Sequence, residues 1–179
     1  MGAAGCLGSG SVVVVAAGLS GGRDGCVVLV ELLTLVVAMA RDTEEAMSAE
    51  NVETLRRYHE LLNGTGEAPI ELFDPAVEIH MFRGSPIPGP YRGHLGLRQW
   101  RQDTFDVIDA WRLELDEVIT GDDPDVMVAL ERFVGRMKHT DLAANFPLAV
   151  LVRFRDGLIV RFEGYREPSE ALEAAGLRD

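Results

Sequence analysis

The sequence predicts an α+β fold: a cone-shaped, curved and mostly antiparallel sheet packed against helices, with an N-terminal tail outside the core. The first observation is the order of elements, because a run of four strands joined by short turns follows two helices and a first strand. The second is Asp156-Gly157 between two stretches of alternating apolar residues, the strongest local signal for a β-hairpin. A long hairpin needs further strands beside it and a cover over its apolar face. We expect the earlier segments to supply both.

Composition excludes several functional classes. The chain has 179 residues, 47% of them hydrophobic, which fits one domain with a sizeable core. Its formal net charge of -12 argues against nucleic acid or an anionic membrane surface as a partner. Cys6 and Cys26 both lie in the N-terminal tail, so we expect no disulfide framework, thiol nucleophile or cysteine-built metal site in the domain.

Residues 1–46 differ in composition from the rest, and we interpret them as a hydrophobic extension that is poorly structured or not native to the protein. The apolar run at residues 26–40 is shorter than the roughly 20 residues of a membrane-spanning helix. A secretory signal would need a net basic region before that run, and here Arg23 is offset by Asp24. No membrane association is therefore predicted.

Export is the alternative for these residues, since Ala38-Met39-Ala40 resembles a signal cleavage site. We favour Met47 as the natural start, because the residues after it are typical of the beginning of a soluble domain, with Ser48 or Asn51 able to cap a helix. The domain then covers residues 47–179, and we predict a cytoplasmic protein.

The first half of the domain is predicted to be helix, strand, helix. Apolar side chains at helical spacing indicate the two helices, and alternating ones indicate the strand. A loop rich in proline and glycine separates the strand from the second helix. In order, these segments are residues 50–63 (helix), 68–73 (a further turn), 77–82 (strand after Asp74-Pro75), 83–92 (loop) and 93–109 (helix).

The second half is predicted to be four strands and a closing helix. Residues 112–120 and 126–138 alternate as strands, and residues 145–155 and 158–165 form the hairpin. Pro168-Ser169 opens the last helix and Gly176 suits its end.

Three segments resemble the SnoaL-like branch of the nuclear transport factor 2 superfamily. They are Asp74-Pro75 before VEIHMF, the loop ending in GPYRG at residues 89–93, and the closing RFRDGLIVRFEGYREPSEALEAAGL. The resemblance covers about residues 49–177 and depends on the order and spacing of these segments. It implies a nuclear transport factor 2-like cone that is often a homodimer through the outer sheet face. Members include polyketide cyclases, ketosteroid isomerase, epoxide hydrolases and many pocket proteins of unknown activity, so the fold does not settle the function.

The cost of burying charge assigns the strand faces. In the second hairpin strand Arg161 and Glu163 share a face, so that face points outward. Val160, Phe162 and Gly164 then point into the pocket. SnoaL-type cyclases often carry an aspartate where this chain has Gly164. This departure removes the general acid/base that the resemblance implies and weakens the cyclase interpretation.

Glu131 is the first candidate for proton transfer. The same argument turns Arg132 and Arg136 outward and leaves Glu131 among apolar neighbours such as Phe133. A carboxyl group held there can act as a proton shuttle near neutral pH. The alternative is a glutamate paired with an arginine or turned to the rim.

His80 and Tyr58 are two further candidates. His80 lies in the middle of its strand, and its imidazole can exchange a proton or bind a polar ligand atom; the alternative is a solvated or merely hydrogen-bonded histidine. Tyr58 lies on the first helix, where ketosteroid isomerase-like proteins place an oxyanion-binding tyrosine; the alternative is a core tyrosine. His59, His94 and His139 have no carboxylate at ligand spacing in the sequence, so no role is assigned to them.

Six residues are expected to line the pocket for a small hydrophobic molecule. Motifs for a metal site, a nucleophile elbow, a phosphate loop or a dinucleotide are absent from the sequence, so no metal and no cofactor are predicted. The expected lining residues are Trp100, Phe105, Phe133, Val150, Phe162 and Gly164.

Two functional hypotheses follow. In the first, the protein is a cofactor-independent isomerase, cyclase or hydrolase that acts by proton transfer on a hydrophobic ketone or polyketide-like substrate. Tyr58, His80 and Glu131 would then converge on one cavity. In the second, the protein is a non-catalytic ligand-binding or dimerisation domain, which Gly164 favours.

A homodimer is predicted separately. The outward face of the strand at residues 126–138 carries Val128, Leu130 and Val134 between arginines. Such a face is too apolar to stay wholly exposed on a monomer.

Overall fold

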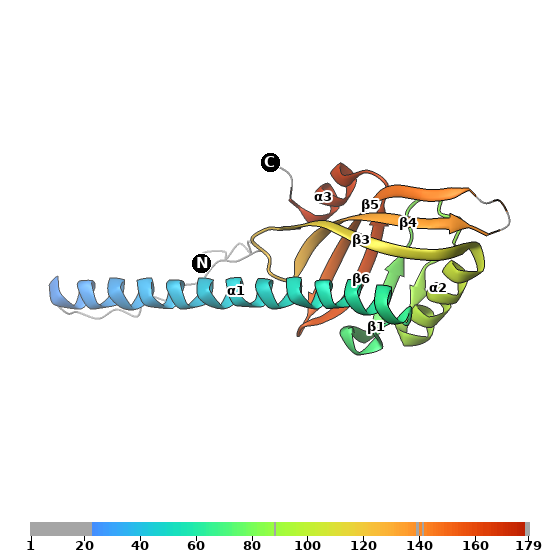
Figure 1. Ribbon diagram of the computed structural model, residues 1–179. Helices are drawn as coiled ribbons and strands as arrows, with labels where there is room; N and C mark the ends of the chain where they lie inside the picture. The colour runs from blue at the N-terminus through green and yellow to red at the C-terminus, as the bar shows by residue number, and fades with distance from the viewer. Residues whose placement is uncertain (1–22, 88, 139, 141, 178–179) are drawn as a thin grey trace, which may run out of the picture. The chain divides into compact units, whose positions relative to one another are not determined.

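The computed structural model describes residues 23–87, 89–138, 140 and 142–177, and it divides the chain after Ala40 into two units. Within these described residues, three helices and a short 3-10 turn accompany six strands (Figure 1). The helical elements are α1 (Arg23–Thr65), η1 (Ile70–Leu72), α2 (Gly93–Val107) and α3 (Pro168–Ala175). The strands are β1 (Phe73–His80), β2 (Tyr91–Arg92), β3 (Ile108–Thr120), β4 (Val126–Met137), β5 (Ala143–Arg155) and β6 (Leu158–Tyr165).

The strands form one curved, unclosed sheet in the order β2-β1-β6-β5-β4-β3. All neighbouring pairs are antiparallel except β1 and β6, which run parallel. The predicted α+β fold with a mostly antiparallel sheet is therefore confirmed. Two local expectations differ: β1 begins earlier than expected, at Phe73, and the predicted loop contains β2. Pairing of β1 with β6 is irregular between Phe73 and Glu78, around Asp74-Pro75, where proline cannot donate a ladder hydrogen bond.

The predicted hairpin is confirmed as β5 and β6. Asp156 and Gly157 adopt φ angles of 53° and 75°, the left-handed values that a two-residue turn with matching twist requires. The register shifts just beyond this turn, so that Phe154 lies opposite Ile159 while Arg153 lies opposite Arg161. Ile159 and Phe162 therefore belong to the core, and the prediction that Val160 faces the pocket is wrong because the irregularity falls on that residue.

Helix α1 is longer than expected. It starts at Arg23, so Ser48 and Asn51 lie inside the helix and the prediction that one of them caps it is wrong. The Asn51 amide instead donates to the Pro124 carbonyl oxygen at 2.9 Å and to Asp125 Oδ1 at 3.2 Å, which ties α1 to the turn between β3 and β4. Residues 1–22 lie outside the described part of the chain, so the interpretation of residues 1–46 stays a prediction. None of the helices in the described ranges is long and apolar enough to cross a membrane.

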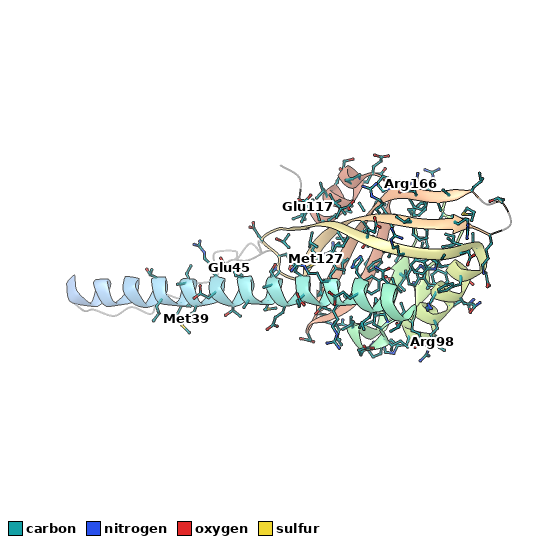
Figure 2. The ribbon with its side chains drawn as sticks, viewed as in Figure 1. Met39, Glu45, Arg98, Glu117, Met127 and Arg166 are labelled. Atoms are coloured by element: carbon teal, nitrogen blue, oxygen red, sulfur yellow. The ribbon has the colours of Figure 1, made fainter. Side chains whose placement is uncertain are left out.

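Two buried clusters lie on opposite faces of the sheet. The inner cluster joins α1 and α2 to the sheet and includes Met127, whose side chain is fully buried (Figure 2). The outer cluster lies under α3 and contains Val128, Ala149 and Ala171, each 0% exposed. Val128 thus does point away from Glu131, but α3 of the same chain covers it. The homodimer remains a prediction, and Val128 no longer supports it because α3 covers this residue.

We expect Ala171→Leu to destabilise the protein by about 1–3 kcal/mol, because the added carbons have no space between α3 and the outer sheet face. Chemical denaturation of wild type and variant measures this difference. Ala174→Leu, on the exposed side of the same helix, is the control and should change the free energy of unfolding by less than about 0.5 kcal/mol. Equal losses in both variants would contradict the packing of α3.

Candidate functional site

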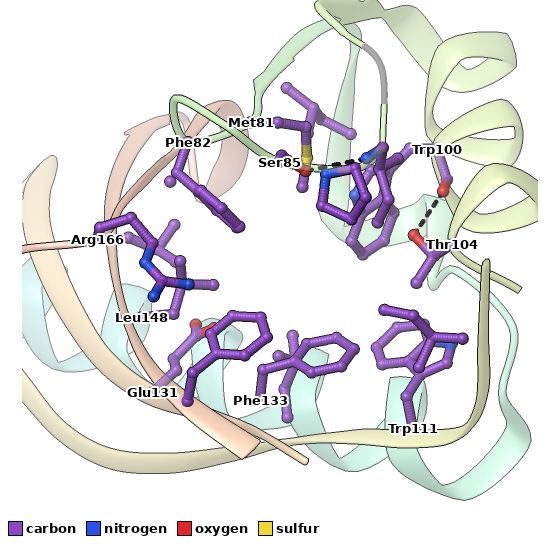
Figure 3. A pocket seen from close by; sticks show the side chains of 18 of the residues that line it. Met81, Phe82, Ser85, Trp100, Thr104, Trp111, Glu131, Phe133, Leu148 and Arg166 are labelled. Atoms are coloured by element: carbon purple, nitrogen blue, oxygen red, sulfur yellow. Dashed lines mark hydrogen bonds between the residues drawn. The ribbon is translucent and has the colours of Figure 1, made fainter. Parts of the chain in front are cut away.

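A cavity of about 160 Å³ lies between α2, the inner face of the sheet and the loop after β1 (Figure 3). Its walls are almost entirely apolar or aromatic. The residues at one end include Glu131, Leu148 and Arg166, and those at the other end include Trp100, Thr104 and Trp111. A mainly apolar cavity with few polar groups is the usual form of a small-molecule site.

One wall of the cavity is a row of stacked aromatic rings. Trp111 stacks on Phe133 with ring centroids 5.6 Å apart, and Phe133 stacks on Phe146 at 5.2 Å. The row crosses three neighbouring strands, and Phe133 is directly opposite Phe146 in the register of β4 and β5. Such a wall presents flat faces to a ligand.

Trp111 is a lining residue that the sequence did not indicate. Ala110 has a φ angle of 47°, and the pairing of β3 with β4 is irregular between Asp109 and Arg112. The irregularity interrupts the alternation of faces along the strand, and Trp111 lies against Phe133. Only its bulk and its place beside a predicted strand would have signalled a role.

Glu131 projects from β4 into the interior. Its strand partner is Leu148, and its side chain is 0% exposed. Oε1 lies 3.0 Å from His59 Nε2. Oε2 has no hydrogen-bond partner among the described residues, although the residue lines the cavity. A buried carboxylate oxygen without a partner is costly and calls for a ligand or a function.

His59 fixes this carboxylate. Its Nδ1 lies 2.8 Å from the Leu55 carbonyl oxygen, and a carbonyl can only accept, so Nδ1 carries a proton and donates it. The remaining nitrogen, Nε2, and Glu131 Oε1 then share the second proton. The prediction that His59 lacks a carboxylate partner is therefore wrong. One feature of the sequence could have indicated that His59 is buried: it lies at helical spacing from Leu55 and Leu62, on the buried stripe of α1.

Electrostatics favour the charged form of the imidazole. Burial lowers the pKa of His59, but the hydrogen bond to Glu131, the charge of that carboxylate and the Leu55 carbonyl outweigh it, so the pKa is raised above its ordinary 6.5. Burial and then the charge of Glu131 raise the pKa of Tyr58 well above its ordinary 10.0, so the phenol stays protonated. The contact with Glu131 thus favours the protonated imidazole of His59.

The three residues predicted to converge do not all meet at the cavity. Tyr58 is 1% exposed and packs edge-on against His59, with ring centroids 5.1 Å apart, but it is not among the lining residues. His80 borders the cavity, yet its Nε2 lies 3.3 Å from Glu78 Oε2, on the strand face opposite the buried Ile79. Of the predicted trio, Glu131 alone has a side-chain oxygen free at this site.

The expected lining residues mostly lie at the cavity. Phe105 does not line it: its ring lies 5.7 Å from that of Trp111 and 4.4 Å from the Arg101 guanidinium carbon. The others, Trp100, Phe133, Val150, Phe162 and Gly164, do line it.

The remaining histidines of the described residues form no second candidate centre. His94 Nε2 lies 2.9 Å from the Phe73 carbonyl oxygen, and His139 is outside the described residues. Across the described ranges, no group of three histidine, cysteine, aspartate or glutamate side chains is placed to hold a metal ion.

A model of the SnoaL-like domain family matches residues 55–162, more than half of the chain. The chain belongs to this family. The matched segment runs from the helix turn before His59 to Phe162 and includes Glu131, so the carboxylate and its partner both lie within the SnoaL-like domain. No curated protein sequence matches the chain.

Solved structures show the same fold at low sequence identity. A hypothetical protein with a ketosteroid isomerase-like fold from Catenulispora acidiphila is 20% identical, with 70% of this chain and 94% of that chain covered and a TM-score of 0.56. A nuclear transport factor 2-like protein of unknown function from Burkholderia pseudomallei is 21% identical, with 70% and 97% covered and a TM-score of 0.58. A candidate polyketide cyclase from Xanthomonas campestris pv. campestris is 18% identical, with 69% and 95% covered and a TM-score of 0.56. These similarities establish the fold of the SnoaL-like domain and no activity.

The stability of the SnoaL-like domain should depend on pH through His59. The folded pKa is raised above the unfolded value near 6.5, so the stabilisation is fully present below about pH 6.5 and is lost as pH rises through the folded pKa. In Glu131→Gln the two raising causes that come from Glu131 are gone, and burial, the largest cause, outweighs the remaining hydrogen bond to the Leu55 carbonyl oxygen. The sign therefore reverses, and stability falls as pH drops below about 6.5. We expect the gap in unfolding free energy between wild type and Glu131→Gln to widen as pH falls from about 8 to about 5.5.

Urea unfolding at a series of pH values measures this gap. Glu117→Gln, an exposed carboxyl on β3 (Figure 2), is the matched control and should follow the wild type at every pH. A gap that stays constant over the range would contradict the pairing of His59 with Glu131.

Proposed function

We propose that this protein is a cofactor-independent isomerase or cyclase that moves a proton on a hydrophobic ketone, with Glu131 as the general base. The observation that carries the proposal is Glu131 Oε2, a buried carboxylate oxygen without a partner among the described residues, in the lining of an otherwise apolar cavity. Proton transfer by a positioned side chain typically contributes about 10² to 10⁴ in rate.

The His59 contact prepares Glu131 for this role. The imidazolium donates from Nε2 to Oε1, which holds the carboxylate in one orientation and balances its charge in the interior. Because Oε1 is occupied, Oε2 is the oxygen that takes a proton. The base is therefore oriented before the ligand binds, which lowers the cost of reaching the reactive geometry.

The chemistry proceeds through a carbon acid. The bond between hydrogen and the carbon beside the ketone breaks, its proton bonds to Oε2, and the electron pair remains on the substrate as an enolate. In a β,γ-unsaturated ketone, return of the proton from Oε2 to the γ carbon moves the double bond into conjugation with the carbonyl group and completes an isomerisation. Attack of the enolate carbon on a second carbonyl group of the same molecule forms a ring, and the new alkoxide takes the proton back from Oε2. Either sequence is balanced without a cofactor.

The family supports this assignment, and the position of the carboxyl group refines it. The family resemblance implies an aspartate at the position of Gly164 on β6. Gly164 pairs with Val150, and Val150 pairs with Ala129, the inward neighbour of Glu131 on β4. The carboxyl group therefore enters the same cavity from β4 instead of β6. Glu131 takes the place of the missing aspartate as the base.

A non-catalytic ligand-binding domain is the second candidate. Gly164 favours it, because a glycine there leaves the cavity larger and removes an acid/base group on which the family resemblance relies. The apolar walls would then serve binding alone.

The test is exchange of the hydrogens beside the carbonyl of 2-tetralone, a bicyclic hydrophobic ketone, in D2O followed by proton NMR. The wild-type protein should accelerate exchange over buffer, and Glu131→Gln should lose at least about 10² of that acceleration because the amide cannot accept the proton. Glu117→Gln should exchange like the wild type. Binding of 2-tetralone without acceleration would favour the non-catalytic candidate, and full activity in Glu131→Gln would overturn the assigned base.

A further inference from the structure

Arg166 lies at the mouth of the cavity against two aromatic rings. Its guanidinium carbon is 4.9 Å from the ring centroid of Phe146 and 5.3 Å from that of Phe82. The two rings meet edge to face at 6.0 Å, so they form a corner beside the cation. Such contacts attract a guanidinium to aromatic rings through the ring quadrupole.

Arg166 forms no ion pair within the described residues, unlike two neighbouring arginines. Arg155 lies 2.8 Å from Asp74, and Arg161 lies 2.8 Å from Glu163. Among the described residues no carboxylate lies within ion-pair distance of Arg166, although glutamates line the neighbouring surface groove. In a chain with net charge -12, an arginine left without an ion pair in a cavity wall is a distinct local feature.

The position of Arg166 relative to Glu131 sets a spacing. Glu131 pairs with Leu148 across β4 and β5, and Arg166 directly follows Tyr165, which pairs with Ala149. Glu131, Leu148 and Arg166 thus form a row across three chain segments at one end of the cavity (Figure 3). Two strand spacings separate the backbones of Glu131 and Arg166 by about 10 Å.

The donors of Arg166 suit one kind of ligand atom. A guanidinium held beside aromatic rings without an ion pair keeps its N–H groups for a ligand, and their fork geometry matches the two oxygens of a carboxylate. Charge-assisted hydrogen bonds of this type are roughly twice as strong as neutral ones. The adjoining row of stacked rings, from Phe146 to Trp111, suits a flat ligand body.

We propose that Arg166 binds a carboxylate on the substrate, so that the ligand of this cavity is a flat, hydrophobic keto acid bound as its anion. The inference rests on the proposed function for the ketone end of the molecule, which Glu131 serves. Arg166 holds the anionic end at the mouth and thereby places the carbon beside the ketone near Oε2. It is a positioning and specificity residue, and it does not touch the proton that moves.

Binding of two matched probes tests the proposal. 2-Naphthoate and 2-naphthamide have the same ring system and differ in the charge of one group. Titration calorimetry should show the wild type binding 2-naphthoate about tenfold more tightly than 2-naphthamide, the ratio expected for one charge-assisted contact. Arg166→Met, which keeps the length and the apolar contact with the rings, should bring the ratio close to one, and Arg166→Lys should restore part of it.

Two controls separate this result from general electrostatics and from catalysis. Arg83→Met removes an exposed positive charge beside the cavity, outside its lining, and should keep the wild-type ratio. Glu131→Gln should also keep the preference for 2-naphthoate, because the preference does not depend on proton transfer. Absence of ketone exchange in the wild type, with its preference for 2-naphthoate intact, would thus refute the proposed function while sparing the role of Arg166.

Three results would overturn the inference. The first is no binding of 2-naphthoate to the wild type, and the second is equal affinity for both probes. The third is an unchanged ratio in Arg166→Met.

Discussion

The contact between His59 and Glu131 is the interaction on which the site depends. A carboxylate buried among apolar side chains is costly, and removal of the partner of a buried charge destabilises a protein by about 3–5 kcal/mol. Here the partner comes from α1 and the carboxylate from β4, at 3.0 Å, so helix and sheet must meet in one register. The Leu55 carbonyl fixes the imidazole in turn. The contact that stabilises the packing of α1 on the sheet therefore also orients the proposed base, Glu131.

This contact also explains the polarity of the cavity. One carboxylate oxygen is held by His59, and the other is left without a partner in a wall of aromatic and aliphatic groups. At the mouth, Arg166 rests on Phe82 and Phe146. The cavity thus offers a ligand the unpaired Glu131 oxygen inside, the Arg166 cation at the mouth and mostly apolar walls between them. We infer that it selects a molecule with the complementary pattern.

Features that depend on neighbouring residues, such as turns and helix ends, could be predicted from the sequence. Contacts between residues far apart in the chain could not. The Asp156-Gly157 turn and the end of α3 at Gly176, whose φ is 74°, depend on neighbouring residues and were predicted. The inward direction of Glu131 followed from the cost of turning Arg132 inward. The partner of Glu131 did not, because His59 lies 72 positions away and only the packing of α1 on the sheet brings them together. Trp111 and Val160 were missed because irregular pairing shifts the faces of β3 and β6.

The protonation of the His59 imidazole tests the central claim most directly. Proton–nitrogen NMR correlation, assigned with His59→Gln, reports which ring nitrogen carries a proton as pH changes. The arrangement predicts that Nδ1 stays protonated from about pH 5.5 to about 9, that the titration is seen at Nε2, and that its midpoint falls in Glu131→Gln. Loss of the proton from Nδ1 with rising pH, or an unchanged midpoint in Glu131→Gln, would contradict the account.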